Sequence, residues 1–226
     1  MIQTLTKPIQ TLVSHHSYPK IFIIGLPRTG TTSISVAMLE LGFKVAHTAF
    51  TKQAFVLADV ISDAPCFADY AQLDKLFPGS KFIYLERELS LWIPSMQRLL
   101  TKMAPHLIAK TGHFSPVLKR AFNISFGEDH SIRGSEQHLT HCYLAHQEQV
   151  QGYFKGRDNL LSINLKSQNS YNEMCAFLSL NSEGINKFPH LNQGVQVANW
   201  KAYKHTNKIN SFSAGKEHRK FFDYIN

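Results

Sequence analysis

A glycine-containing segment that follows a short apolar run constrains the fold of this chain more than any other feature. The run KIFII at residues 20–24, which is apolar from Ile21 on, is followed by GLPRTGTT at residues 25–32, which has the glycine spacing of a phosphate-binding loop. Apolar residues at helical spacing over 33–41 then predict a helix, and Gly42 suits its C-terminal end. Strand, loop and helix occur in the order that such a loop requires, so the segment predicts a phosphate bound at a helix N-terminus.

The remaining pattern alternates between strands and helices. Short apolar runs predict strands over 43–47, 58–62, 81–85 and 160–165, and helical spacing predicts helices over 69–77, 89–103, 138–154 and 171–178. Pro94 must lie in the first turn of its helix or kink it. This alternation predicts an α/β fold of the P-loop NTPase-like type, with three layers and a mostly parallel central sheet flanked by helices.

Charge and cysteine content narrow the class of protein. The chain has 24 Lys and Arg against 16 Asp and Glu, a net charge of +8 that favours an anionic partner. Its three cysteines are far apart and suggest neither a disulfide framework nor a zinc site. The sequence shows neither the apolar core of a signal peptide nor a membrane span, so we expect a cytoplasmic protein.

The loop lacks the lysine of nucleotide triphosphatases. In those proteins the lysine after the second glycine reaches the β- and γ-phosphates, whereas this chain has Thr31 there. Arg28 instead provides a planar set of donors that suits phosphate or sulfonate oxygens. The loop therefore favours a phosphate ligand other than a triphosphate.

Two motifs resemble those of sulfotransferases. The segment PRTGTT at residues 27–32 is similar to the family's 5′-phosphosulfate loop, P-K-S-G-T-T, with arginine in place of lysine. The second motif is an arginine at a strand end with a serine eight residues later, matched here by Arg87 and Ser95. A diffuse third likeness, from Tyr143 to Asn192, extends the resemblance over about 20–192.

The resemblance implies a donor, 3′-phosphoadenosine 5′-phosphosulfate, used as a co-substrate without a metal ion. It implies that Arg87 and Ser95 bind the 3′-phosphate and that Arg28 stabilises charge on the leaving phosphate. The full set of donor-binding residues that it implies is Pro27, Arg28, Thr29, Gly30, Thr31, Thr32, Ser33, Arg87 and Ser95.

The general base has two candidates. The family places a histidine or glutamate beyond the strand that precedes the 3′-phosphate strand, and Asp63 lies there, 24 residues before Arg87. Asp63 is the first choice, although an aspartate with a reference pKa of about 3.9 is a weak base unless burial raises it. His47 follows another predicted strand, and a histidine's reference pKa of about 6.5 suits proton transfer better.

Other parts of the chain depart from the family pattern or have no assigned role. The chain has no R-K-G element, and His218-Arg219-Lys220 is a weak match to it. Trp92 either stacks on the adenine or is a buried aromatic residue. We expect one domain over 1–226, with a possible insertion or lid at 104–137 and a solvated basic tail at 200–226.

Two other functions remain open. A P-loop kinase or NTPase would need magnesium and an acidic ligand, which Asp63 could provide. A non-catalytic nucleotide-binding module would use the basic charge, but no nucleic-acid-binding signature appears. The partners expected are thus a nucleotide donor and an unidentified hydroxyl or amine acceptor, without nucleic acid. The sequence leaves the oligomeric state undetermined.

Overall fold

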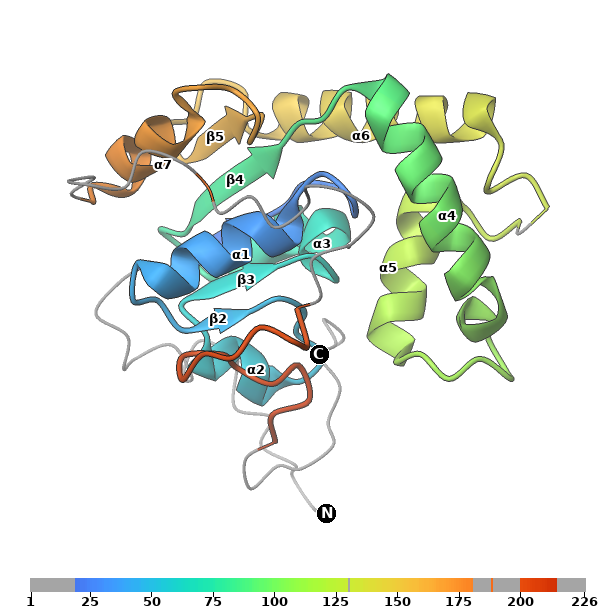
Figure 1. Cartoon of the computed structure of the whole chain (residues 1–226), viewed down its shortest axis with the longest axis horizontal. Helices are drawn as coiled ribbons and strands as arrows, with labels where there is room; N and C mark the ends of the chain where they lie inside the picture. Colours follow the sequence, from blue (N-terminus) through green and yellow to red (C-terminus); the bar gives the residue numbers. More distant parts are fainter. Residues whose placement is uncertain (1–18, 130, 181–187, 189–199, 215–226) are drawn as a thin grey trace, which may run out of the picture.

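A parallel five-stranded sheet forms the centre of the molecule. The computed structural model describes residues 19–129, 131–180, 188 and 200–214. The strands are β1 (Ile21–Ile23), β2 (Val45–Ala46), β3 (Val60–Ser62), β4 (Lys81–Leu85) and β5 (Leu160–Ile163). They pair in the order β2-β3-β1-β4-β5, and every pair is parallel (Figure 1). The predicted α/β fold class is confirmed.

Helices connect these strands. They are α1 (Thr31–Glu40), α2 (Lys52–Leu57), α3 (Cys66–Leu76), α4 (Leu89–Leu107), α5 (Pro116–Phe126), α6 (Glu136–Tyr153) and α7 (Ser170–Leu178). The sequence pattern predicted five of them and missed α2 and α5. Pro94 lies inside α4, which continues past a second proline, Pro105. No helix in the described part of the chain combines the length and apolarity needed to cross a membrane.

Alternating strand residues build a separate apolar layer on each face of the sheet. Ile21 and Ile23 of β1 pack with residues of α1 and α7. Phe22 lies between them in sequence and packs with residues of α2, α3 and α6. Because successive side chains of a strand point to opposite faces, the two layers of helices follow from this alternation. The predicted three-layer arrangement is therefore present.

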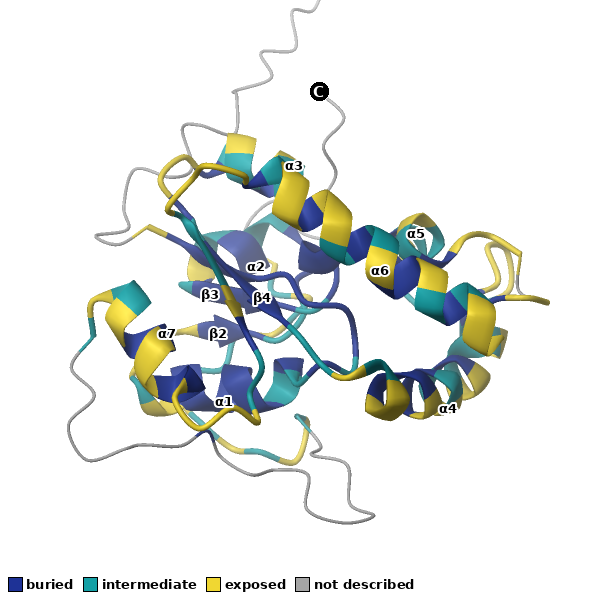
Figure 2. Cartoon of the chain, turned by 90° about the horizontal axis from the view of Figure 1, so that it is seen from above, coloured by how far each residue is buried: buried dark blue, intermediate teal, exposed yellow. Residues whose placement is uncertain are grey.

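A third apolar cluster lies beside the sheet, around α4 and α5. Trp92 of α4, Phe122 of α5 and Leu139 of α6 are all buried in it. The long helix α6 contacts α4 and α5 through its N-terminal half and the sheet layer through Val150, so it joins both parts (Figure 2). Residues 104–137, expected as an insertion or lid, thus contain the end of α4 and all of α5. Their role as a lid stays a prediction.

Residues 200–214 lie along the outer edge of β2, and we call them the C-terminal strap (Figure 1). The backbone N–H of Val45 donates to the Asn207 carbonyl at 3.0 Å, and Ile209 N–H donates to the Val45 carbonyl at 2.9 Å. The backbone of this part of the expected basic tail is therefore paired with the sheet, while each of its residues stays exposed or half-buried. The other part of the tail, 215–226, lies outside the described residues, as do most of 181–199.

Candidate functional site

Four of the predicted site residues lie just beyond the carboxyl ends of four neighbouring strands. Arg28 is in the loop after β1, His47 follows β2 directly, Asp63 follows β3 directly, and Arg87 is two residues beyond β4. These strands are parallel and adjacent, so their carboxyl ends share one edge of the sheet. Ligands of open α/β sheets bind at this edge.

Two glycines allow the phosphate loop to turn tightly against β4. A Cβ on Gly25 would lie 2.6 Å from the Leu85 Cβ and 2.9 Å from the Leu85 nitrogen, so only glycine fits without movement. Gly30 has a φ of 117°, in the left-handed region that glycine adopts at little cost. The glycine spacing that predicted the loop therefore has a steric cause.

Side chains hold the loop from behind. Thr29 Oγ1 donates to the Leu26 carbonyl at 2.7 Å, which closes the turn. Trp92 is fully buried, and its Nε1 donates to the Pro27 carbonyl at 2.8 Å. Of the two roles expected for Trp92, the structure supports the buried one, because its ring is not accessible to an adenine.

The loop leads directly into α1, and no side chain caps the N-terminal backbone amides of this helix. Gly30 is the N-cap and supplies no side-chain oxygen, and the first turn has no acidic residue. Thr31 and Ser33 are buried there, whereas Thr32 is partly exposed. An uncapped helix N-terminus with hydroxyl groups beside it suits an anion.

Two arginines and a serine meet beside this loop. Arg28 Nε donates to Ser95 Oγ at 2.8 Å, and Arg87 Nη1 donates to the Arg28 carbonyl at 2.6 Å. The three residues come from the loop, from the end of β4 and from α4. The two motifs thus form one site, although some 60 residues separate Arg28 from Arg87 in sequence.

A third arginine, which the sequence motifs did not include, adds to this charge. Burial lowers the pKa of both Arg28 and Arg87, and the positive charge of Arg98 lowers each pKa further. Arg98 is exposed and lies three residues after Ser95 in α4, a spacing that places both on one face of the helix. The three-residue spacing from Ser95 is the sequence feature that could have identified Arg98. Positive charges held this close favour a bound anion.

The end of β4 is fixed by Tyr143 of α6. The Tyr143 hydroxyl donates to the Arg87 carbonyl at 2.8 Å and accepts from the Arg87 N–H at 2.8 Å. The Tyr143 ring packs against Trp92, with ring centres 4.9 Å apart. Tyr143 and Trp92 therefore support Arg87 and the phosphate loop through backbone hydrogen bonds.

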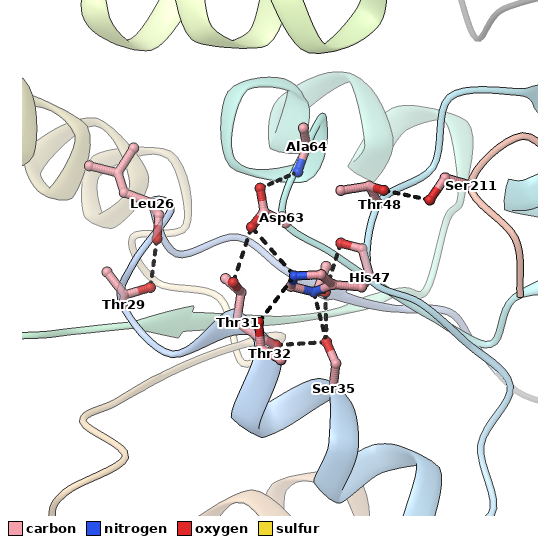
Figure 3. Close-up of polar contacts among 11 residues, drawn as sticks. Leu26, Thr29, Thr31, Thr32, Ser35, His47, Thr48, Asp63, Ala64 and Ser211 are labelled. Carbon is pink, nitrogen blue, oxygen red and sulfur yellow. Dashed lines mark hydrogen bonds and ion pairs between the residues drawn. The ribbon is translucent and has the colours of Figure 1, made fainter. Parts of the chain in front are cut away.

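His47 and Asp63 face each other at the start of α1 (Figure 3). His47 Nε2 lies 3.8 Å from Asp63 Oδ2, and the two side chains are 14% and 18% exposed. Asp63 Oδ2 accepts from Thr31 Oγ1 at 3.1 Å, and its Oδ1 accepts from the Ala64 N–H at 2.8 Å. The structure thus brings both candidate bases next to the phosphate loop.

The hydrogen bonds around His47 indicate which ring nitrogen holds the proton. Nδ1 lies 2.9 Å from Ser62 Oγ and 3.3 Å from Ser35 Oγ. The Ser35 hydroxyl donates to the Thr31 carbonyl, and the Ser62 hydroxyl has either Ser35 Oγ, at 2.7 Å, or the His47 carbonyl as its acceptor. With both hydroxyl protons used in this way, the pattern favours Nδ1 as the donor to Ser62 Oγ. Nε2, 3.3 Å from Thr32 Oγ1, is left with its lone pair.

Burial lowers the pKa of His47, and the positive charge of Lys208 lowers it further, while the Asp63 carboxylate opposes both effects. The net direction favours a neutral imidazole. A neutral ring with a free lone pair on Nε2 can accept a proton, and the adjacent carboxylate can stabilise the imidazolium that forms.

Comparison with known proteins gave one family match. A family model described as "Sulfotransferase domain" matches residues 20–55 and 49–197, which is most of the chain. The matched part contains the phosphate loop, both candidate bases, Arg87 and Ser95, and it ends before the C-terminal strap. No curated protein matched the chain.

Proposed function

The chain belongs to the sulfotransferase family, and we propose that it moves a sulfonate group from 3′-phosphoadenosine 5′-phosphosulfate to a hydroxyl or amine acceptor. The observation that supports this donor is the convergence of Arg28, Arg87 and Ser95 at the phosphate loop. A donor with phosphates at both its 5′ and 3′ positions would use the loop and the arginine pair together.

The donor-binding roles divide between the two ends of the site. The α1 N-terminus, with Thr31 and Thr32, would hold the 5′-phosphosulfate, and Arg28 would stabilise the charge that develops on the leaving phosphate oxygen. Arg87 and Ser95 would bind the 3′-phosphate through charge-assisted hydrogen bonds. Because Arg28 bonds to Ser95, the same contact would couple the two ends of the donor site.

The transfer itself would be an in-line displacement at sulfur. The acceptor oxygen forms the new O–S bond as the S–O bond to the 5′-phosphate breaks, and the electron pair of that bond goes to the phosphate oxygen. The acceptor's proton goes to the His47–Asp63 pair. Of the two candidate bases, the hydrogen-bond pattern favours His47 Nε2 as the atom that takes the proton, with Asp63 stabilising the imidazolium.

Binding of 3′-phosphoadenosine 5′-phosphate, the donor product, tests the proposal directly. Calorimetric titration without magnesium should show binding to the wild-type chain, and Arg87→Ala should weaken it about 10- to 100-fold. This is the effect expected when about 1.5–3 kcal/mol of charged hydrogen bonding to a phosphate is lost. Arg157→Ala is the control, because that arginine pairs with Asp74 away from the loop.

The alternative kinase or NTPase makes the opposite prediction. Magnesium-dependent binding of ATP, together with no binding of the 3′-phosphorylated nucleotide, would contradict the sulfotransferase donor. ADP serves as the second control, because it has the 5′-phosphates and lacks the 3′-phosphate. Melting temperatures of each variant separate a lost contact from a lost fold.

A further inference from the structure

The C-terminal strap packs directly against the candidate base. The ring of Trp200 lies 5.2 Å from the ring of His47, measured between ring centres. Lys208 Nζ lies 4.4 Å from the centre of the Trp200 ring and donates to the carbonyls of Trp200 and Tyr203, at 2.6 Å each. Trp200 therefore contacts both His47 and the Lys208 ammonium.

The strap is bound to the chain on both sides of His47. Before it, Val45 shares two backbone hydrogen bonds with the strap. After it, Thr48 Oγ1 lies 2.5 Å from Ser211 Oγ (Figure 3), and the Phe50 N–H donates to the Ser211 carbonyl at 2.9 Å. Movement of the strap would therefore move the segment that holds His47.

Charged and polar groups surround His47 from three directions. Asp63 faces it from the end of β3, and Lys208 acts on it from the strap. The hydroxyls of Thr32 and Ser35 face it from α1, and that of Ser62 from β3. Asp63 attracts a proton to the ring and Lys208 opposes it, so the strap supplies the charge that balances the carboxylate.

We propose that the C-terminal strap takes part in the reaction centre through two positioning residues, Trp200 and Lys208. They keep His47 Nδ1 hydrogen-bonded to the Ser62 hydroxyl and leave Nε2 unprotonated. Trp200 fills the space beside the ring and excludes water from it. Lys208 fixes Trp200, and its positive charge disfavours protonation of the His47 ring. Only the use of that lone pair in catalysis rests on the proposed function; the state of His47 does not.

Nitrogen-15 NMR of the histidine side chains tests the proposal without an acceptor. The shifts and couplings of the ring nitrogens report both the tautomer and the titration of His47, and His47→Asn assigns its signals. We expect a proton on Nδ1 in the wild-type chain. Lys208→Met should raise the pKa of His47, because a positive charge is removed, and Trp200→Ala should let the Nε2–H tautomer appear. Trp200→Phe should restore the wild-type tautomer.

The matched control is Phe212→Leu, which changes another aromatic contact of the strap, with Phe50. A strap that only stabilises the fold would lower the melting temperature in all these variants and leave the His47 titration unchanged, which would overturn the proposal. A wild-type His47 with its proton on Nε2 would also overturn it. Nucleotide titration of the same samples tests the donor separately, so a failure to bind the nucleotide is distinguishable from an unchanged His47.

Discussion

At the residue scale, Gly25 shows most directly how the sequence determines the site. It lies where the chain leaves β1 and passes against β4, and the Cβ and backbone nitrogen of Leu85 leave no room for a methyl group there. Both atoms belong to the rigid sheet, so neither can move away easily. The approach of the loop to β4 is what brings Arg28 within reach of Arg87.

Gly25→Ala adds only a methyl group, but it should disturb the phosphate loop and the proposed donor site strongly. We expect a loss of stability of about 1–3 kcal/mol from overpacking, and weaker nucleotide binding. Gly152→Ala is the control, since nothing lies within 4 Å of a Cβ there and α6 should gain up to about 1 kcal/mol from alanine. Chemical unfolding and calorimetry measure both effects. Equal responses of the two variants would contradict the steric explanation.

Local spacing predicted the phosphate loop and the arginine and serine beside it, but it did not predict the residues that support them. The loop, Arg87 and Ser95 have motifs whose spacing reflects a strand end or a helix start. Tyr143 and Trp92 act through hydrogen bonds to backbone carbonyls of distant segments, and no local pattern encodes such a contact. The state of His47 likewise depends on serines from two other elements and on the strap.

At the element scale, an ion pair joins α3 to α5. The Asp69 carboxylate is fully buried and accepts two bonds from Arg120, both at 2.7 Å. A second pair, between Arg157 and Asp74, has the same two-bond geometry, but its carboxylate is 14% exposed. In Arg157→Ala, water and the Tyr153 hydroxyl, which donates to Asp74 Oδ2 at 2.8 Å, would still reach the Asp74 carboxylate.

Arg120→Ala should cost about 3 kcal/mol of unfolding free energy, because it removes this partner from a buried carboxylate. Arg157→Ala should cost less than about 1 kcal/mol, as expected for a solvated pair. Urea unfolding of the two variants measures the difference. If both lose the same stability, burial of the carboxylate is not what makes the α3–α5 contact strong.

Element prediction failed where helices are short or where the backbone alone makes the contact. The six-residue α2 has too few residues for a periodic pattern. The start of α5 did have a signal, since Ser115 caps it and Pro116 occupies its first turn. The strap binds the edge of β2 through backbone groups, so the basic side chains of the tail contained no information about that pairing.

At the scale of the whole molecule, His146 of α6 lies where the sheet layer meets the helical cluster. Its Nε2 donates to the Phe67 carbonyl of α3 at 2.7 Å, and its ring lies 5.7 Å from that of Tyr84 in β4. Burial lowers the pKa of His146 to about 4. Protonation would place a charge at the junction that holds the two parts together.

This burial predicts how stability depends on pH. Between about pH 6.5, where a histidine of the unfolded chain titrates, and about pH 4, the unfolded state binds a proton at position 146 that the folded state does not. Stability should therefore fall as the pH is lowered through this window, by up to about 3 kcal/mol from this residue, with no further loss from it below pH 4. His47, whose pKa is also lowered, adds to the loss in the same direction.

Unfolding by urea at pH 7, 6 and 5 measures this dependence. His146→Gln should flatten it, because glutamine does not titrate, whatever the variant's stability at pH 7. His141→Gln, which removes an exposed histidine from the same helix, is the matched control. An unchanged slope in His146→Gln would mean that the acid sensitivity comes from other groups. A flattened slope would show that protonation of His146, at the junction between the sheet and the helical cluster, causes much of the loss of stability in acid. The candidate site includes residues from both sides of this junction, so it would lose its support at the same pH.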